Sequence, residues 1–148
     1  MIKIKKILAP TDFSPSSESA IDYAETFAKR FEAEIVLIHV IESPAYSVTD
    51  TLILVNHEAA LKATAEALME NLYKACLEKG LSATTRVISG TPYREIIKEA
   101  EAEKVDLIIM GTHGRTGVER LLLGSVAEKV VRLAAAPVLT VRSPETPG

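Results

Sequence analysis

The chain alternates strand-like and helix-like segments along its whole length. Short apolar runs with the length and β-branched content of strands cover residues 4–9, 34–41, 83–88, 105–110 and 138–141. Most of these runs are continuous, which indicates strands that are covered on both faces, as in parallel sheets. The segments between them carry apolar residues at helical spacing. The order βαβαβαβαβ predicts an α/β fold with an open, doubly wound, five-stranded parallel sheet and helices on both faces.

Local signals set the expected helix boundaries. Ser14-Pro15 and Thr91-Pro92 each predict a helix start, because a capping residue is followed by a first-turn proline. A long second helix, ending at Gly80, is indicated by Leu61, Ala65, Leu68, Leu72 and Cys76. The last helix is expected to begin at Ser125 and to end near Ala135.

The expected strand order is 3-2-1-4-5. In that order the chain reverses between strands one and four, and α/β proteins bind ligands at the carboxyl ends of the strands at such a switch point. The loops that meet there are residues 10–14 and 111–124.

The fourth strand runs directly into a glycine-spaced loop. Gly111, Gly114, Gly124 and Ser125 have the spacing G-x2-G-x9-G-S. Glycine leaves backbone N–H groups accessible, and the helix start that follows adds partial positive charge. This arrangement predicts an anion cradle, and in an α/β protein a nucleotide phosphate is the expected anion. The loop has neither the P-loop pattern nor G-x-G-x-x-G, since no lysine precedes Ser125.

The start of the last helix has two compatible interpretations. Ser125 and Glu128 have the spacing of an S-x-x-E capping box, which makes Ser125 the expected N-cap. The Ser125 hydroxyl and N–H could also face a phosphate. Gly111 and Gly124 have a purely structural interpretation as strand end and helix start. The four glycines of this stretch, counting Gly117, are more than a simple turn needs, which favours the cradle.

Several side chains near these loops could carry chemistry. Asp12 follows the first strand, where a carboxylate can bind a ribose or hold a metal through water, or can simply form a turn. His113 could act as a base, donate a hydrogen bond to a phosphate or be an ordinary loop residue. We favour the loop residue or a backbone contact. Arg115 and Arg120 either pair with phosphates or are solvated charges. His39 is interpreted as a satisfied core residue. No catalytic residue is assigned, because neither a Ser-His-Asp set nor paired carboxylates can be assembled.

Composition narrows the class of protein. The 148 residues are expected to form one domain, 1–148, with 143–148 as a flexible tail. The net charge of −3, without a basic aromatic stripe, gives no reason to expect nucleic acid binding. No run has transmembrane length and no secretory signal is present, so we expect a cytoplasmic protein without membrane association. The lone Cys76 excludes disulfide scaffolds and cysteine-based zinc sites.

Three segments together resemble the universal stress protein family. They are Pro10-Thr11-Asp12, Ile38-His39-Val40 and the Gly111-x2-Gly114-x9-Gly124-Ser125 motif, and the similarity extends from Ile4 to Val141. The glycine motif resembles that of the branch in which it cradles ATP, whereas a second branch lacks these glycines. The resemblance implies a Rossmann-like fold of the adenine nucleotide alpha hydrolase-like type and a role in the stress response or in signalling.

The resemblance also implies roles for individual residues. Asp12 would contact the ribose or the adenine, and Val40 would offer main-chain hydrogen bonds to adenine. Pro10 and Thr11 would shape the base pocket, while Met110 and Gly111 would lie against the ribose. The phosphates would be surrounded by Gly114, Gly124, Ser125 and Val126, and His113 and Arg115 complete the candidate nucleotide contacts.

Cofactor and partner follow from the same resemblance. ATP is the implied ligand, with Mg²⁺ or Mn²⁺ bridging its phosphates, and the protein ligands of the metal are unknown. A homodimer is implied through the last strand, Pro137 to Arg142, whose apolar edge can pair with a copy of itself.

Other functions stay open on the sequence alone. A slow ATPase would activate water through Asp12 or His113, although no residue is placed like a phosphate-loop lysine or a water-orienting glutamine. A third possibility is a protein that dimerises without nucleotide, its glycines being structural. Flavin binding, known in a related α/β fold, is a further one. Whether the chain is an enzyme is therefore not fixed, and a slow ATPase is the most that is expected.

Overall fold

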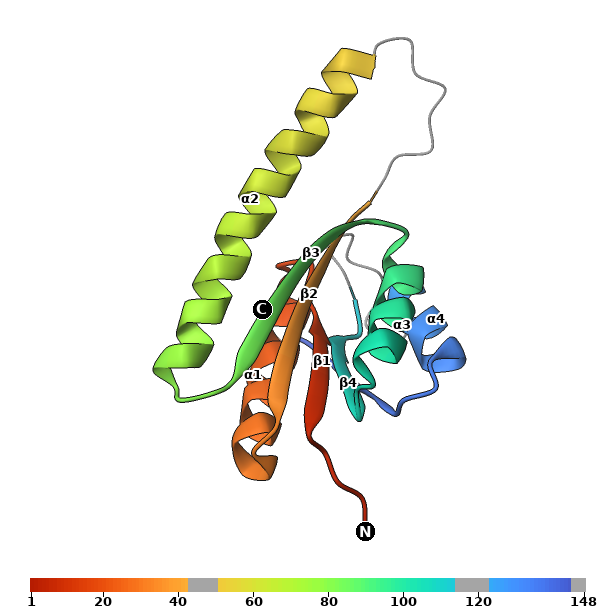
Figure 1. Ribbon diagram of the computed structural model, residues 1–148. Coiled ribbons are helices and arrows are strands. Elements are labelled where there is room, and N and C mark those ends of the chain that lie inside the picture. The colour runs from red at the N-terminus through yellow and green to blue at the C-terminus, as the bar shows by residue number, and fades with distance from the viewer. Residues whose placement is uncertain (43–50, 114–122, 145–148) are drawn as a thin grey trace.

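The chain folds into a five-stranded parallel sheet with helices on both faces (Figure 1). The computed structural model describes residues 1–42, 51–113 and 123–144. The strands are β1 (Lys6–Pro10), β2 (Glu34–Glu42), β3 (Ala83–Gly90), β4 (Leu107–Gly111) and β5 (Val138–Val141). Their order, β3-β2-β1-β4-β5, confirms the predicted topology.

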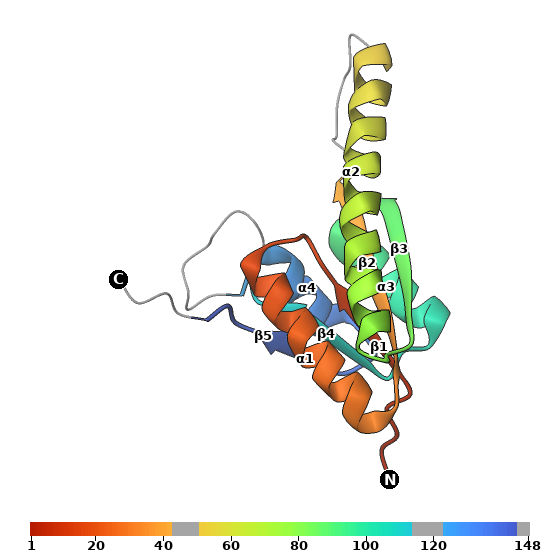
Figure 2. The same ribbon diagram turned by 90° about the vertical axis from the view of Figure 1, so that its left-hand side faces the viewer.

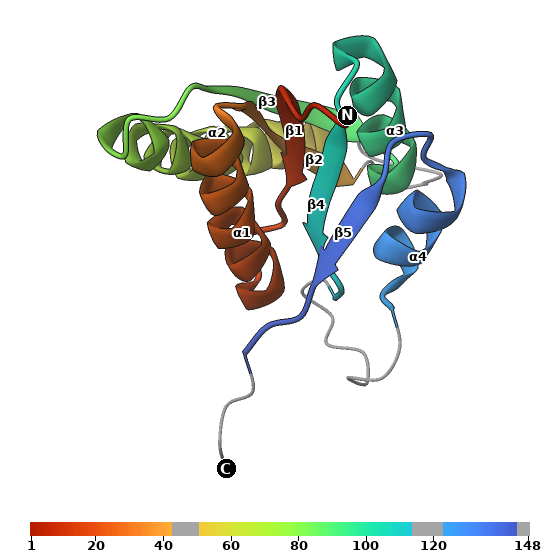
Figure 3. The ribbon, with the colours of Figure 1, turned by 90° about the horizontal axis from the view of Figure 1, so that it is seen from below.

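Two hydrophobic layers enclose the sheet. The helices α1 (Pro15–Phe31) and α2 (Thr51–Glu78) cover one face, and α3 (Pro92–Glu103) and α4 (Ser125–Leu133) cover the other (Figure 3). Neighbouring residues of a strand point to opposite faces. Accordingly, Ile7 and Ile109 lie in the layer under α1, whereas Leu8 and Ile108 lie in the layer under α3 and α4, and all four are fully buried.

The predicted helix starts at the two proline signals are confirmed. Ser14 is the N-cap of α1, and its hydroxyl accepts a hydrogen bond from the Ser17 N–H at 3.3 Å. Thr91 is the N-cap of α3 but makes no side-chain capping bond. Capping by the Ser14 hydroxyl satisfies one of the N–H groups that a helix start leaves without an intrahelical acceptor.

The second helix is longer than its apolar pattern predicts. α2 begins at Thr51, well before Leu61, and it extends past the end of the sheet (Figure 2). The apolar periodicity marks only the half that packs on the sheet, where Ala65, Met69 and Cys76 are buried. Along residues 55–64 the side chains are exposed, so no inward-facing pattern is required of them. Of the helices in the described ranges, none combines the length and apolarity needed to cross a bilayer.

The thiol of Cys76 should be unreactive in the folded protein. Burial, followed by the nearby Glu25 carboxylate, raises the pKa of the Cys76 thiol from 9.0 to about 11, so the uncharged form prevails at pH 8. A disulfide reagent such as DTNB should therefore label Cys76 slowly at pH 8 and rapidly in urea. Labelling of the native protein at pH 8 as fast as in urea would contradict the expected burial.

This raised pKa also links stability to pH. The neutral thiol favours the folded state below pH 9, and this contribution is lost as pH rises from 9.0 through about 11.

Candidate functional site

The two strands at the switch point separate toward their carboxyl ends. β1 pairs with β4 only at Ile7↔Leu107 and Leu8↔Ile108, although the strands continue to Pro10 and Gly111. The carboxyl ends of β1 and β4, with residues 10–14 and 111–113, are called the switch-point edge below. This is the position at which the strand order predicts a ligand site.

Backbone groups from two flanking strands point toward this edge. The Thr11 N–H donates to the Ile38 carbonyl at 2.8 Å, so the polar groups of Ile38 face β1. Because a strand repeats every two residues, the N–H and C=O of Val40 face the same side, beyond the last β1–β2 pair, Pro10↔Ile38.

β4 presents its backbone in the same way from the opposite side. The N–H groups of Ile108 and Thr112 donate to β5 and its entry, to Pro137 and Val141 at 2.9 Å each. Because successive residues of a strand point their backbone N–H and C=O to opposite sides, Gly111 turns its own N–H and C=O toward β1. Val40 and Gly111 thus turn their backbone polar groups toward the switch-point edge from opposite sides.

Asp12 organises the turn that follows β1. Its Oδ1 accepts hydrogen bonds from the Ser14 N–H and from the Ser17 hydroxyl, each at 3.0 Å. Thr11 supports the same turn, since its hydroxyl lies 3.1 Å from the Ser17 hydroxyl and accepts from the Phe13 N–H at 3.0 Å. The structural role that the sequence allowed for Asp12 is present, and the half-buried carboxylate also lies at the switch-point edge.

Phe13 and His39 support this turn in a way that sequence reasoning missed. Phe13 has a φ of 64°, in the left-handed region that non-glycine residues seldom occupy. Its ring packs on the His39 imidazole with the centroids 4.6 Å apart. The His39 Nδ1 lies 2.8 Å from the Thr11 carbonyl oxygen and must donate, because that oxygen can only accept. His39 is satisfied, as expected, but it holds the turn instead of filling the core, and no periodicity in the sequence marks this role.

Gly111 is required by packing. A Cβ at this position would contact the Ser16 hydroxyl and lie 2.8 Å from the Ser16 carbonyl carbon. The start of α1 therefore packs directly against the end of β4. The buried Ser16 hydroxyl donates to the Val141 carbonyl at 3.2 Å, and the His113 N–H points at Ser16 Oγ from 3.4 Å. These contacts join the start of α1 to the ends of β4 and β5.

The predicted capping box at the start of α4 is wrong. The Gly124 carbonyl accepts from the Glu128 N–H at 2.9 Å, so the N-cap is Gly124, and Ser125 is the first residue of the helix. Glu128 pairs with Arg132 at 3.4 Å. The cause is a non-local bond, because the Gly124 N–H donates to the Thr112 carbonyl at 2.6 Å and fixes where the helix begins.

The corrected boundary keeps α4 suited to binding an anion. The first-turn N–H groups, including those of Ser125 and Val126, have no acceptor four residues earlier in the helix, and the helix dipole is positive there. The Ser125 side chain is exposed.

The structure places most of the predicted site residues around one edge. They are Pro10, Thr11, Asp12, Val40, Gly111, His113, Gly124, Ser125 and Val126, together with Met110, whose side chain is buried in the layer under α3 and α4. Gly114 and Arg115, with Gly117 and Arg120, lie outside the described residues. Within the described ranges, no group of three or more His, Cys, Asp or Glu side chains could hold a metal ion.

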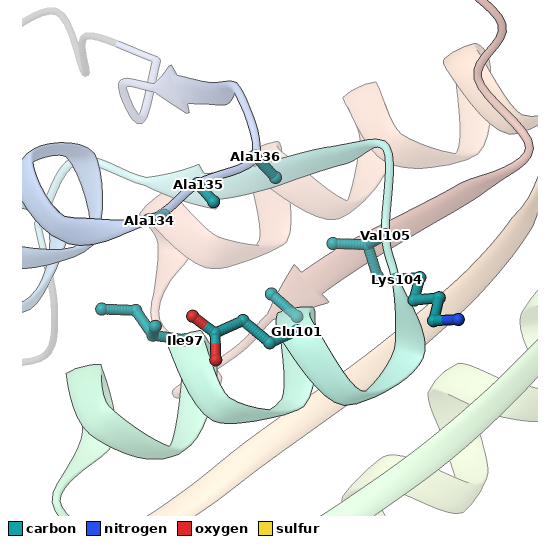
Figure 4. Close-up of a pocket in the computed structure, with 8 residues that line it drawn as sticks. Ile97, Glu101, Lys104, Val105, Ala134, Ala135 and Ala136 are labelled. Atoms are coloured by element: carbon teal, nitrogen blue, oxygen red, sulfur yellow. The ribbon is translucent and has the colours of Figure 1, made fainter.

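A separate pocket lies at the other end of the sheet. It has a volume of about 260 Å³ and lies between the C-terminal part of α3 and the segment after α4 (Figure 4). Its lining is mostly small and apolar, with two charged side chains: Ile97, Ala100, Glu101, Lys104, Val105, Ala134, Ala135 and Ala136. None of the predicted site residues that the structure describes lines it.

Known proteins resemble this chain over nearly its whole length. Residues 3–142 match the model of the universal stress protein family. Universal stress protein MJ0531 of Methanocaldococcus jannaschii is 40% identical over 142 residues, which are 95% of this chain and 84% of that protein. The solved structure of MJ0577, a universal stress protein of the same organism, is 36% identical with a TM-score of 0.86, covering 98% of this chain and 100% of that one.

A more distant solved structure shares the fold. It is a universal stress protein family protein from Arabidopsis thaliana with AMP bound, 22% identical, with a TM-score of 0.70, covering 95% of this chain and 92% of that one. At this identity the similarity establishes the fold alone.

Proposed function

The chain belongs to the universal stress protein family, and from that premise we propose that it binds ATP at the switch-point edge as a nucleotide-binding module of the stress response. The observation that carries the proposal is the orientation of three sets of backbone groups. Those of Val40 and Gly111 face the edge from opposite sides. The third set is the first turn of α4, whose N-cap, Gly124, is hydrogen-bonded to Thr112 just after β4.

The chemistry of these groups fits an adenine nucleotide. An adjacent N–H and C=O, as at Val40, can bond the donor and acceptor edge of adenine. The Asp12 carboxylate can accept from ribose hydroxyls, and the first turn of α4, at Ser125 and Val126, can bind phosphate. The Arabidopsis thaliana protein, which shares the fold, has AMP bound, so this fold can accommodate an adenine nucleotide. Mg²⁺ or Mn²⁺ would be held mainly by the phosphates, in keeping with the preference of Mg²⁺ for few protein ligands.

We propose binding ahead of hydrolysis because of what Asp12 already does. Its Oδ1 accepts two hydrogen bonds inside the turn, which suits a positioning group better than a general base. Slow hydrolysis of bound ATP is the second candidate function, and phosphate release measures it.

We also propose that two copies of the chain pair through the outer edge of β5.

The proposal is tested by nucleotide recovery and by calorimetry. Freshly purified protein should release ATP or ADP close to one per chain on denaturation, and the emptied protein should bind Mg·ATP with measurable heat and a higher melting temperature. If millimolar ATP, ADP and AMP produced neither heat nor a rise in melting temperature, the nucleotide function would be excluded.

Asp12→Asn should distinguish the role of Asp12 in the turn from its proposed role in binding ATP. The amide oxygen can still accept from Ser14 and Ser17, so the melting temperature should stay close to wild type. Loss of the carboxylate should weaken ATP binding by roughly tenfold, the cost of one charge-assisted hydrogen bond.

Asp106→Asn is the matched control in calorimetric titrations with ATP. Its carboxylate accepts from the Lys5 and Lys6 N–H groups at the opposite end of the sheet, and an asparagine oxygen can do the same. It should leave ATP affinity unchanged. Equal affinities for wild type and both variants would remove Asp12 from the site.

A further inference from the structure

A lysine is held against an aromatic ring between the two helices on the α3–α4 face. The Lys129 ammonium lies 4.9 Å from the centroid of the Tyr93 ring. Tyr93 is the second residue of α3, and Lys129 lies one turn after Ser125 in α4. Figure 3 shows these helices side by side on the same face of the sheet.

The ring is packed against the protein, and among the described residues no carboxylate is paired with the Lys129 ammonium. Tyr93 packs against the apolar layer beneath α3 and α4, and its hydroxyl accepts from Arg94 Nε at 2.9 Å. In the part of the chain that the structure describes, Lys129 makes no ion pair, and the adjacent Glu128 is paired with Arg132. A half-buried ammonium that is held over a ring, with no carboxylate bound, is suited to meet an anion from outside.

The ammonium lies toward the end of the sheet at which a nucleotide is proposed to bind. Side chains of a helix lean toward its N-terminus, so the stem of Lys129 runs back along the turn that starts at Ser125. Tyr93 stands at the start of α3, directly after the carboxyl end of β3. The cation is therefore held near the starts of both helices, next to the first turn of α4.

We propose that Lys129, positioned by Tyr93, binds the terminal phosphates and makes the site selective for nucleoside di- and triphosphates over monophosphates. The inference rests on the proposed nucleotide function and adds a discriminating residue to it. A single phosphate is accommodated by the N–H groups at the start of α4. A longer chain carries more negative charge and extends beyond that turn, where an ammonium contributes to binding.

Calorimetric titration of ATP and AMP into four proteins tests the inference. Lys129→Met keeps the helix and the stem but removes the charge. It should reduce the ratio of ATP to AMP affinity by roughly tenfold, as expected for one charged contact, and leave AMP affinity within about twofold. Lys129→Arg should retain most of the ratio, because a guanidinium keeps the charge and also stacks on the ring. Lys98→Met, which removes an exposed lysine of α3, should match wild type.

The outcomes separate this inference from the function on which it rests. An unchanged ratio in Lys129→Met, with AMP still bound, would overturn the selectivity and leave the nucleotide site standing. Equal losses of ATP and AMP affinity would also overturn it, since a general structural role would then explain the effect. A wild-type protein that binds neither nucleotide would overturn the proposed function itself.

Discussion

Replacing Gly111 by alanine should lower the free energy of unfolding by about 3 kcal/mol, the upper end of the usual range for overpacking. The new Cβ would lie 2.8 Å from the Ser16 carbonyl carbon. That atom belongs to the backbone of the first turn of α1, so no side-chain rotation can relieve the contact. Either α1 or the end of β4 must move. Urea unfolding followed by circular dichroism, with m-values compared, measures the change.

Two further variants identify the cause of this loss. Gly80→Ala has no atom within 4 Å of the new Cβ but has a φ of +76°, so only backbone strain of about 1 kcal/mol is expected there. Ser16→Gly should partly rescue Gly111→Ala, because it removes the side-chain contacts and leaves the carbonyl contact. A loss at Gly111 no larger than that at Gly80 would contradict the close approach of α1.

The arrangement of the switch-point edge could be predicted because it depends on strand order. Asp12 and Gly111 are far apart in sequence, yet each follows a strand whose place in the sheet is limited by burial and by right-handed crossovers. Once β1 and β4 are neighbours in a parallel sheet, the residues after both strands must meet at the same end. The alternation of strands and helices was therefore enough to bring these two residues together.

Features that depend on particular non-local contacts could not be predicted. The S-x-x-E pattern at Ser125 satisfies a local rule, but the bond from the Gly124 N–H to the Thr112 carbonyl decides where α4 starts. The left-handed Phe13 and its ring contact with His39 are equally invisible in sequence, because no periodicity marks them. Each of these differences changes how the site is supported and leaves its position in the fold unchanged.

The outer edge of β5 carries a regular set of outward-facing backbone groups. Pro137 and Val141 offer their carbonyls to the β4 side, to the N–H groups of Ile108 and Thr112. By the two-residue repeat, Val138 and Thr140 turn their N–H and C=O away from β4, along the free edge of the sheet. An edge of this kind can pair with itself about a two-fold axis.

Thr140→Pro should therefore dissociate the proposed homodimer. Proline removes the outward N–H and is tolerated on an edge strand, while the bonds to β4 are kept because they come from Pro137 and Val141. Each dimer loses the bond twice, about 2–4 kcal/mol in total, which raises the dimer dissociation constant roughly 30- to 700-fold. Sedimentation velocity across a concentration series measures this, with Thr140→Val, which keeps the N–H, expected to match wild type. Dimerisation of Thr140→Pro as tight as that of the wild-type protein would place the contact elsewhere, and a wild-type protein that sediments as a monomer would exclude the dimer.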